Sequence, residues 1–117
     1  MMKGSNMVPV LNNIGVEVAC IGNHDLDYGI EELETLTKAT KFPWMMSNMA
    51  DRKTGKLLAN SKETYVVVDQ TTGLKIGYFA VGEEEWIHTL ATSVDKSRIL
   101  YTHQIEVGKR LANYLRK

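Results

Sequence analysis

The chain has 117 residues, which at about 150 residues per domain amounts to one domain. Its 44% hydrophobic and 24% charged residues are typical of a folded globular protein rather than a disordered one. Fourteen basic and fourteen acidic residues leave no formal net charge, which argues against binding to nucleic acid. The single cysteine, Cys20, excludes an internal disulfide, and its apolar neighbours predict a buried, unreactive thiol.

The first half of the chain alternates between helical and extended patterns. Ser5 or Asn6 can cap a helix that ends at Gly15, and a second helix is expected over 29–39. Apolar runs at 16–21 and 42–47 read as buried strands. Helices and strands that alternate in this way predict an α/β layer with a parallel sheet.

The second half begins with a polar, turn-rich loop at 48–60, followed by two β-rich runs. These runs, at 64–69 and 74–81, flank a turn at 70–73 and predict a hairpin. Further on we expect a short helix or ordered loop at 83–90, a polar linker at 91–96 and a brief strand at 99–101. Thr102 can cap a last helix, whose inner face would hold these residues: Ile105, Gly108, Leu111, Ala112 and Leu115.

The segment 22–29, Gly-Asn-His-Asp-Leu-Asp-Tyr-Gly, carries the densest set of chemically active side chains. It follows the predicted strand at 16–21, and ligands of α/β folds bind at the carboxyl ends of strands. Asn23 offers a neutral oxygen to a divalent cation, and His24 can give a proton to a departing oxygen. On composition alone, a turn with solvated polar side chains explains the segment equally well.

The octapeptide resembles a signature block of the calcineurin-like metallophosphoesterases, and its full form looks like their 5′-nucleotidase branch. Other segments are similar to that branch as well: 7–12, 42–44, 47–48, 53–56 and 75–79. The resemblance implies part of a two-sheet core with flanking helices, an incomplete α/β/β/α fold. It also implies two divalent metal ions in the intact protein, with Zn, Mn, Mg and Fe not distinguished.

The resemblance assigns roles to three residues of the block. Asn23 takes the place of a metal ligand, and His24 takes the place of the histidine that contacts the phosphate. Asp27 matches the carboxylate that pairs with this histidine, which makes His24 and Asp27 the expected catalytic residues. Asp25 is expected to shape the loop.

The chain also departs from the family, which builds its metal centre from five separated blocks. No aspartate or histidine precedes Gly22, and the later histidines, His88 and His103, do not lie in a Gly-His-x-His block. We therefore expect 1–117 to be a single partial catalytic domain, without a separate nucleotide-recognition domain. His88 and His103 are expected to have surface or packing roles.

Three functional hypotheses remain. In the first, the chain is a fragment of a phosphoesterase whose parent hydrolyses phosphate monoesters, with nucleotides as the expected substrates, and the isolated chain is inactive. In the second, it is a non-catalytic binding or structural piece. In the third, it completes a metal site with another chain.

No apolar stretch reaches the roughly 18 residues of a membrane span, and the N-terminus lacks a signal peptide, so a chain complete as given would be cytoplasmic. Exposed strand edges predict self-association or marginal stability.

Overall fold

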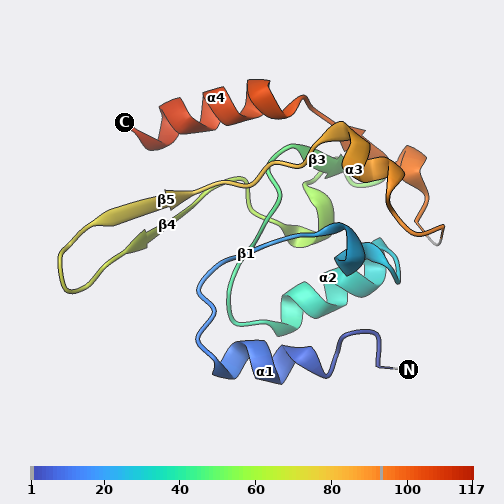
Figure 1. Cartoon of the computed structure of the whole chain (residues 1–117), viewed down its shortest axis with the longest axis horizontal. Helices are drawn as coiled ribbons and strands as arrows, with labels where there is room; N and C mark the ends of the chain where they lie inside the picture. The colour runs from blue at the N-terminus through green and yellow to red at the C-terminus, as the bar shows by residue number, and fades with distance from the viewer. Residues whose placement is uncertain (1, 93) are drawn as a thin grey trace.

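The computed structural model describes residues 2–92 and 94–117, and it places the helices around three pairs of short strands (Figure 1). The Cα radius of gyration is 14.8 Å and the principal extents are 45 × 35 × 22 Å. A compact chain of this length has a radius of gyration of about 13 Å. The excess comes from a hairpin that projects from the body of the molecule.

The N-terminal half forms the expected α/β layer. Two short strands, β1 (Ala19–Cys20) and β2 (Trp44–Met45), pair in parallel, which confirms the parallel arrangement but shortens both predicted strands. Among the described residues β1 pairs with β2 alone, and their ladder has two residue pairs. The helical elements of this half are α1 (Met7–Asn13), the 3₁₀ helix η1 (Asn23–Leu26) and α2 (Ile30–Ala39).

The segment 48–60 is more ordered than its polar composition predicts. It contains strand β3 (Met49–Asp51) and the 3₁₀ helix η2 (Leu58–Asn60), and the predicted turn lies between them. Met49 and Leu58 are fully buried. A few apolar side chains within a polar segment are enough to fold it against the core.

The hairpin of β4 (Tyr65–Val68) and β5 (Lys75–Tyr78) is antiparallel, as predicted. Its register places Val67 opposite Ile76 on one face and Val66 opposite Gly77 on the other. Apolar side chains therefore occupy both faces, unlike the apolar–polar alternation of a hairpin with one solvated face. At its base, Gly77 packs against the Leu115 side chain, and a Cβ added at this position would lie 3.1 Å from the nearest Leu115 methyl carbon, so Leu115 would have to shift to admit it.

The C-terminal part supplies three helical elements and one strand: α3 (Glu84–His88), the 3₁₀ helix η3 (Lys96–Arg98), β6 (Ile99–Tyr101) and α4 (Gln104–Leu115). Strand β6 pairs antiparallel with β3. The N-cap of α4 is His103 rather than Thr102, because its Nδ1 accepts a hydrogen bond from the Ile105 backbone N–H (3.3 Å). The buried face of α4 carries Val107 and Leu111, whereas Ile105 is 56% exposed, contrary to the prediction.

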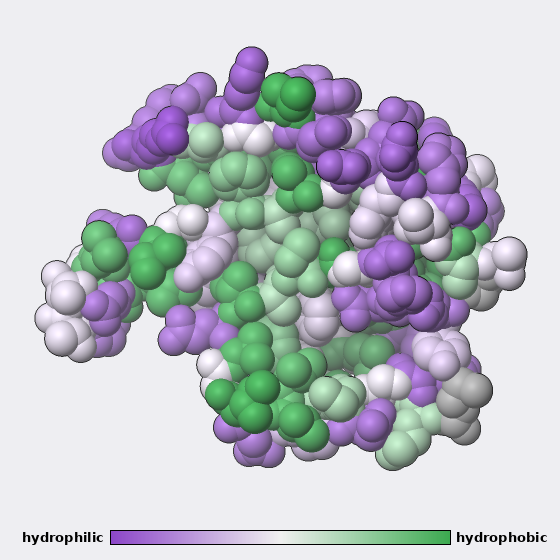
Figure 2. Space-filling view, in the orientation of Figure 1, coloured by the Kyte–Doolittle hydropathy of each residue, from purple (hydrophilic) through white to green (hydrophobic). Residues whose placement is uncertain are grey.

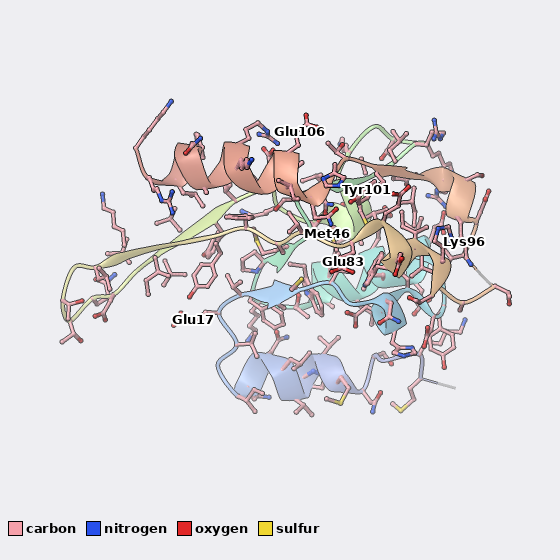
Figure 3. The ribbon with its side chains drawn as sticks, turned by 45° about the horizontal axis from the view of Figure 1, so that its top comes forward. Glu17, Met46, Glu83, Lys96, Tyr101 and Glu106 are labelled. Atoms are coloured by element: carbon pink, nitrogen blue, oxygen red, sulfur yellow. The ribbon has the colours of Figure 1, made fainter. Side chains whose placement is uncertain are left out.

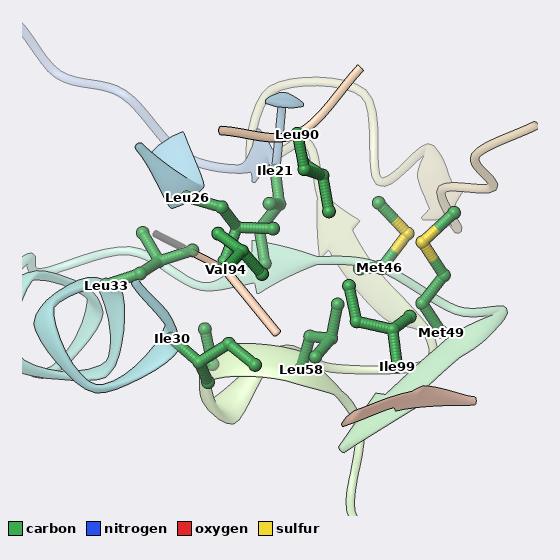
Figure 4. Packing of buried hydrophobic residues seen from close by; sticks show 11 residues of the cluster. Ile21, Leu26, Ile30, Leu33, Met46, Met49, Leu58, Leu90, Val94 and Ile99 are labelled. Atoms are coloured by element: carbon green, nitrogen blue, oxygen red, sulfur yellow. The ribbon is translucent and has the colours of Figure 1, made fainter. Parts of the chain in front are cut away.

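The core gathers side chains from most of these elements (Figure 4). Its largest members come from η1, α2, β3, η2, β6, the segments after β1 and β2, and the segment between α3 and η3: Ile21, Leu26, Ile30, Leu33, Met46, Met49, Leu58, Leu90, Val94 and Ile99. Helix α1 buries no residue. The core therefore holds the carboxyl end of β1 in place while α1 packs loosely outside it. No helix among the described residues is long and apolar enough to cross a membrane.

Exposed apolar side chains gather on the hairpin and over α1 (Figure 2). Those of the hairpin include Val66, Val68, Leu74 and Ile76. A two-stranded hairpin is marginally stable in water, and strand edges of this kind are templates for pairing with another chain. The formal net charge of zero offers no overall repulsion against such pairing.

We expect copies of the chain to associate through this hairpin at micromolar concentration. The double substitution Val66→Lys and Val68→Lys places charges beside the strand edge and should return the chain to a monomer. Ile105→Lys, an exposed apolar-to-lysine change on α4, is the matched control. Sedimentation velocity over a concentration series measures the outcome, and a wild-type chain that stays monomeric throughout contradicts the prediction.

Candidate functional site

The octapeptide at 22–29 forms the tight connection between β1 and α2. Two buried side chains, Ile21 and Leu26, anchor it in the core on either side of the turn. Gly29 caps α2 with a φ of 95°, a left-handed conformation that favours glycine. The Gly22 backbone N–H donates to Asp25 Oδ2 at 2.7 Å, so Asp25 closes the turn, as expected for a residue that shapes the loop.

The structure brings His24 and Asp27 together. The His24 Nδ1 atom lies 3.1 Å from Asp27 Oδ2 and 3.3 Å from Oδ1. A neutral imidazole bonded in this way carries its proton on Nδ1 and leaves Nε2 as the second, unused ring nitrogen. The His24 side chain is 86% exposed and that of Asp27 is 40% exposed. The ring is therefore oriented by the carboxylate and open to a ligand from solvent.

Asn23 is oriented by a residue 66 positions away in the sequence. Its Nδ2 donates to Thr89 Oγ1 at 3.2 Å, and the Thr89 hydroxyl in turn donates to the Trp86 carbonyl at 2.7 Å. Because the amide nitrogen is engaged with Thr89, Oδ1 is the Asn23 atom suited to a cation. Sequence reasoning missed Thr89, and its long separation from Asn23 gave no signal for it.

A hollow of about 530 Å³ lies beside Asn23 and is lined by residues from three parts of the chain: 20–23, Met46 and 81–89. Its apolar wall includes Met46, Val81 and Trp86, and its acidic rim is formed by Glu83 and Glu85. Figure 3 shows Met46 and Glu83 close to one another near the centre of the molecule. Hollows of this size suit small organic ligands.

The three consecutive glutamates, Glu83–Glu85, are exposed. Glu83 caps α3 and the other two lie in its first turn, where the helix dipole favours acidic side chains. Glu83 and Glu85 also reach the rim of the hollow. The segment therefore borders the candidate site.

The prediction that Cys20 is buried is wrong. Its side chain lies at the edge of the hollow and is exposed, so solvent reaches the thiol. Partial burial and the negative charge of Asp25 nevertheless raise the pKa of the Cys20 thiol. A thiol with a raised pKa is mostly protonated near neutral pH, so the expectation of low reactivity still holds on chemical grounds.

The other two histidines lie outside this site. His103 caps α4, and His88 accepts a hydrogen bond on its backbone carbonyl from Lys96 Nζ (3.2 Å). Across residues 2–92 and 94–117, no group of three or more His, Cys, Asp and Glu residues is placed to hold a metal ion. The described residues therefore offer a metal one oriented oxygen at Asn23 and no complete ligand set.

Comparison with known proteins supplies the wider context. No family model matches the chain. A Yersinia enterocolitica protein named 2′,3′-cyclic-nucleotide 2′-phosphodiesterase/3′-nucleotidase is 33% identical over 92 residues, which cover 69% of this chain and 14% of that protein. A Salmonella typhimurium protein of the same name is 35% identical over 85 residues, covering 66% and 13%. The chain thus spans about a seventh of the length of these relatives.

Solved structures agree in fold. A Haemophilus influenzae NAD nucleotidase superposes on 98% of this chain and 20% of its own, with a TM-score of 0.77 and 22% identity. A putative 5′-nucleotidase from Staphylococcus aureus covers 97% of this chain and 21% of its own, with a TM-score of 0.76 and 13% identity. A calcineurin-like phosphoesterase from Bacillus subtilis covers 94% of this chain and 34% of its own, with a TM-score of 0.69 and 16% identity.

These likenesses define the class of fold as that of a metallophosphoesterase, which confirms the α/β expectation. In fold the chain resembles the calcineurin-like metallophosphoesterase superfamily, and in sequence it is similar to the nucleotidases named above. The nucleotidase names of its relatives agree with the branch that the octapeptide resembles. Enzymes of this superfamily depend on metal ions.

Proposed function

We propose that this chain supplies the proton-donating and one metal-binding element of a phosphoesterase that hydrolyses phosphate monoesters, with nucleotides as its substrates. The observation that carries the proposal is the His24–Asp27 hydrogen bond directly beside the oriented amide of Asn23. All three side chains follow the carboxyl end of β1, where α/β folds bind their ligands. The nucleotidase names of the relatives support the nucleotide as substrate class.

Within this proposal the three residues have different tasks. Asn23 offers Oδ1 to a divalent ion, while Thr89 holds its amide nitrogen. Asp27 orients the His24 ring through Nδ1, so that the Nε2–H of the imidazolium form can give its proton to the departing ester oxygen. The open position of the ring lets a phosphate approach Nε2 directly.

The metal ions that we propose for the intact site are two divalent ions, which would neutralise phosphate charge and generate the attacking hydroxide when bound. Asn23 is the residue of this chain that would contact one of them. Because the described residues hold no further ligand cluster, we propose that 1–117 is a partial catalytic domain and that it is inactive in isolation.

A chimera tests this function. In one chimera, this chain replaces the part of the Haemophilus influenzae NAD nucleotidase on which it superposes. A second chimera is built in the same way with the Staphylococcus aureus protein as host. With two host proteins, misfolding of one chimera does not decide the result. Each is assayed with p-nitrophenyl phosphate and AMP in the presence of Mn²⁺. We expect phosphate release above that of a host from which the stretch is deleted. Two folded chimeras without activity overturn the proposal.

The isolated chain should bind divalent metal weakly. Asn23 alone provides one neutral oxygen, whereas tight sites need several ligands that include carboxylates or imidazoles. Titration calorimetry with Mn²⁺ or Zn²⁺ should therefore reveal no pair of sub-micromolar sites, and Asn23→Ala should abolish the weak binding that remains. Two tight sites in the isolated chain contradict this prediction.

A further inference from the structure

A second hollow, of about 380 Å³, lies at the opposite end of the β1–β2 pair from Asn23. It forms where the end of α2 meets the entry to β2 and the segment that follows η2. Residues of all three segments line it: Thr37, Lys38, Thr40, Lys41, Phe42, Pro43, Trp44, Asn60, Lys62 and Tyr65. We call it the lysine hollow. Because β1 and β2 are parallel, the lysine hollow lies at the amino end of the strand pair and the octapeptide follows its carboxyl end.

The lysine hollow is strongly cationic in a chain with no formal net charge. Lys38, Lys41 and Lys62 line it, and no carboxylate does. Among the described residues these three lysines make no ion pair, since the four salt bridges there involve other side chains. The dipole of α2 favours cations at its C-terminal end, where Lys38 and Lys41 lie. It does not account for Lys62, which comes from a different segment.

One part of the wall of the lysine hollow is aromatic, and its rings contact their neighbours. The Trp44 indole N–H donates to Thr40 Oγ1 at 2.9 Å, and the Trp44 and Phe42 rings lie 5.7 Å apart. The Lys62 ammonium lies 5.4 Å above the Tyr65 ring, a distance at which a cation and an aromatic face attract one another. The wall therefore keeps one cation in place while its apolar surface stays open to an organic group.

The backbone at the rim adds a second, independent observation. Ala59 and Asn60 are consecutive non-glycine residues with left-handed φ angles of 50° and 59°. Such conformations cost free energy and gather at ligand sites. Ala59 is fully buried, and its carbonyl accepts a hydrogen bond from Thr37 Oγ1 at 3.0 Å. This contact holds the strained turn and keeps Asn60 at the rim of the lysine hollow.

We propose that the lysine hollow binds an organic phosphate of mononucleotide size, without a metal ion. The three lysines supply charge-assisted contacts to the phosphate, and the apolar wall at Phe42, Pro43 and Trp44 accepts the organic part. A volume of about 380 Å³ exceeds what inorganic phosphate needs and lies within the range of small-ligand sites. This site is distinct from the one at Asn23, and it does not depend on the proposed hydrolytic function.

The two tryptophans of the chain separate the two sites. Trp44 lines the lysine hollow and Trp86 lines the hollow beside Asn23. The variants Trp86→Phe and Trp44→Phe therefore each keep one reporter. The 117-residue chain is titrated with AMP, inorganic phosphate and adenosine in EDTA, so that no metal contributes. We expect saturable change of Trp44 fluorescence with AMP, weaker binding of phosphate and none of adenosine, while Trp86 stays silent.

Charge substitutions then test the contacts. Lys62→Ala should weaken AMP binding about threefold, which is the range of an exposed ion pair, and Lys38→Glu should weaken it further. Lys109→Glu, on the exposed side of α4, is the matched control and should leave binding unchanged. Equilibrium dialysis of radiolabelled AMP measures the affinity independently of fluorescence. No saturable binding to a folded chain, or equal losses in all three variants, overturns the proposal.

Discussion

Replacing His24 by Ala in the active chimera should lower turnover by about 10²–10⁴-fold, the contribution of a positioned general acid. The reason is geometric: His24 is the one imidazole that the structure places beside both Asn23 and an orienting carboxylate, within the described part of the chain. Because the ring is 86% exposed, its removal leaves the core untouched. The loss should therefore fall on kcat rather than on folding or on metal content.

Asp27→Asn should produce a smaller loss than His24→Ala. The amide keeps the size of the carboxylate but removes its charge and can present either an oxygen or a nitrogen to Nδ1. The variant therefore loses the negative charge that stabilises and orients the imidazolium, which is the form of His24 that donates a proton from Nε2.

The control for both variants is His88→Ala, since His88 is exposed and contributes a backbone carbonyl rather than its ring to a contact. Steady-state kinetics and metal analysis of the three variants measure the outcome. Turnover by the His24 variant at the level of the parent chimera contradicts the assigned role, and equal losses in all three variants point to misfolding instead.

Local patterns were enough to predict most elements of this fold. The turn at Gly15, the hairpin and the short strand over 99–101 all follow from residue type within a few positions. The contact between His24 and Asp27 is also predictable from local sequence, because a 3₁₀ turn brings residues three apart into contact. Signals of this kind need no knowledge of the rest of the chain.

Tertiary contacts decided the features that sequence reasoning missed. Segment 48–60 is polar, yet Asp51 is only 1% exposed, because Arg98 from a distant segment forms two hydrogen bonds with its carboxylate. Ile105 lies at a helical spacing consistent with the core but faces solvent, because α4 turns Val107 inward instead. The hydrogen bond between Asn23 and Thr89 depends on the fold and has no local sequence signal. In each case the information lies in a second segment that no local pattern identifies.

Arg98 is the residue whose loss should destabilise the fold most among the charged side chains described. Its Nε and Nη2 atoms contact Asp51 Oδ1 and Oδ2 at 2.9 and 2.8 Å, and its Nη1 pairs with Glu31 of α2. Through these contacts it joins η3, β3 and α2. Asp51 sits at the end of β3, and the Arg52 N–H donates to the Arg98 carbonyl at 2.7 Å, so the backbone is tied at the same point.

Arg98→Met should lower the free energy of unfolding by about 3–5 kcal/mol, the cost of leaving a buried charge without its partner. A chain of this size is stable by about 5–15 kcal/mol, so the variant should lose a large fraction of its stability. The double variant Arg98→Met with Asp51→Leu removes both charges and should recover most of the loss. Arg110→Met breaks the exposed pair with Glu63 and should cost at most about 1 kcal/mol.

The pH dependence of these variants separates the loss of the ion pair from a simple packing defect. In the wild-type chain the hydrogen bonds from Arg98 hold the pKa of Asp51 below its usual range, and the same guanidinium lowers the pKa of Glu31. A folded-state pKa below the unfolded value of about 3.9 contributes stability above that pH, and the contribution disappears as the pH falls through the folded-state value. In Arg98→Met the pKa of Asp51 should shift upward instead, because burial without a partner favours the neutral carboxyl.

Urea midpoints measured from neutral to acidic pH should therefore converge for the wild-type chain and Arg98→Met as the pH falls. A difference between them that stays constant over this range shows that Arg98 acts through packing and not through its charge.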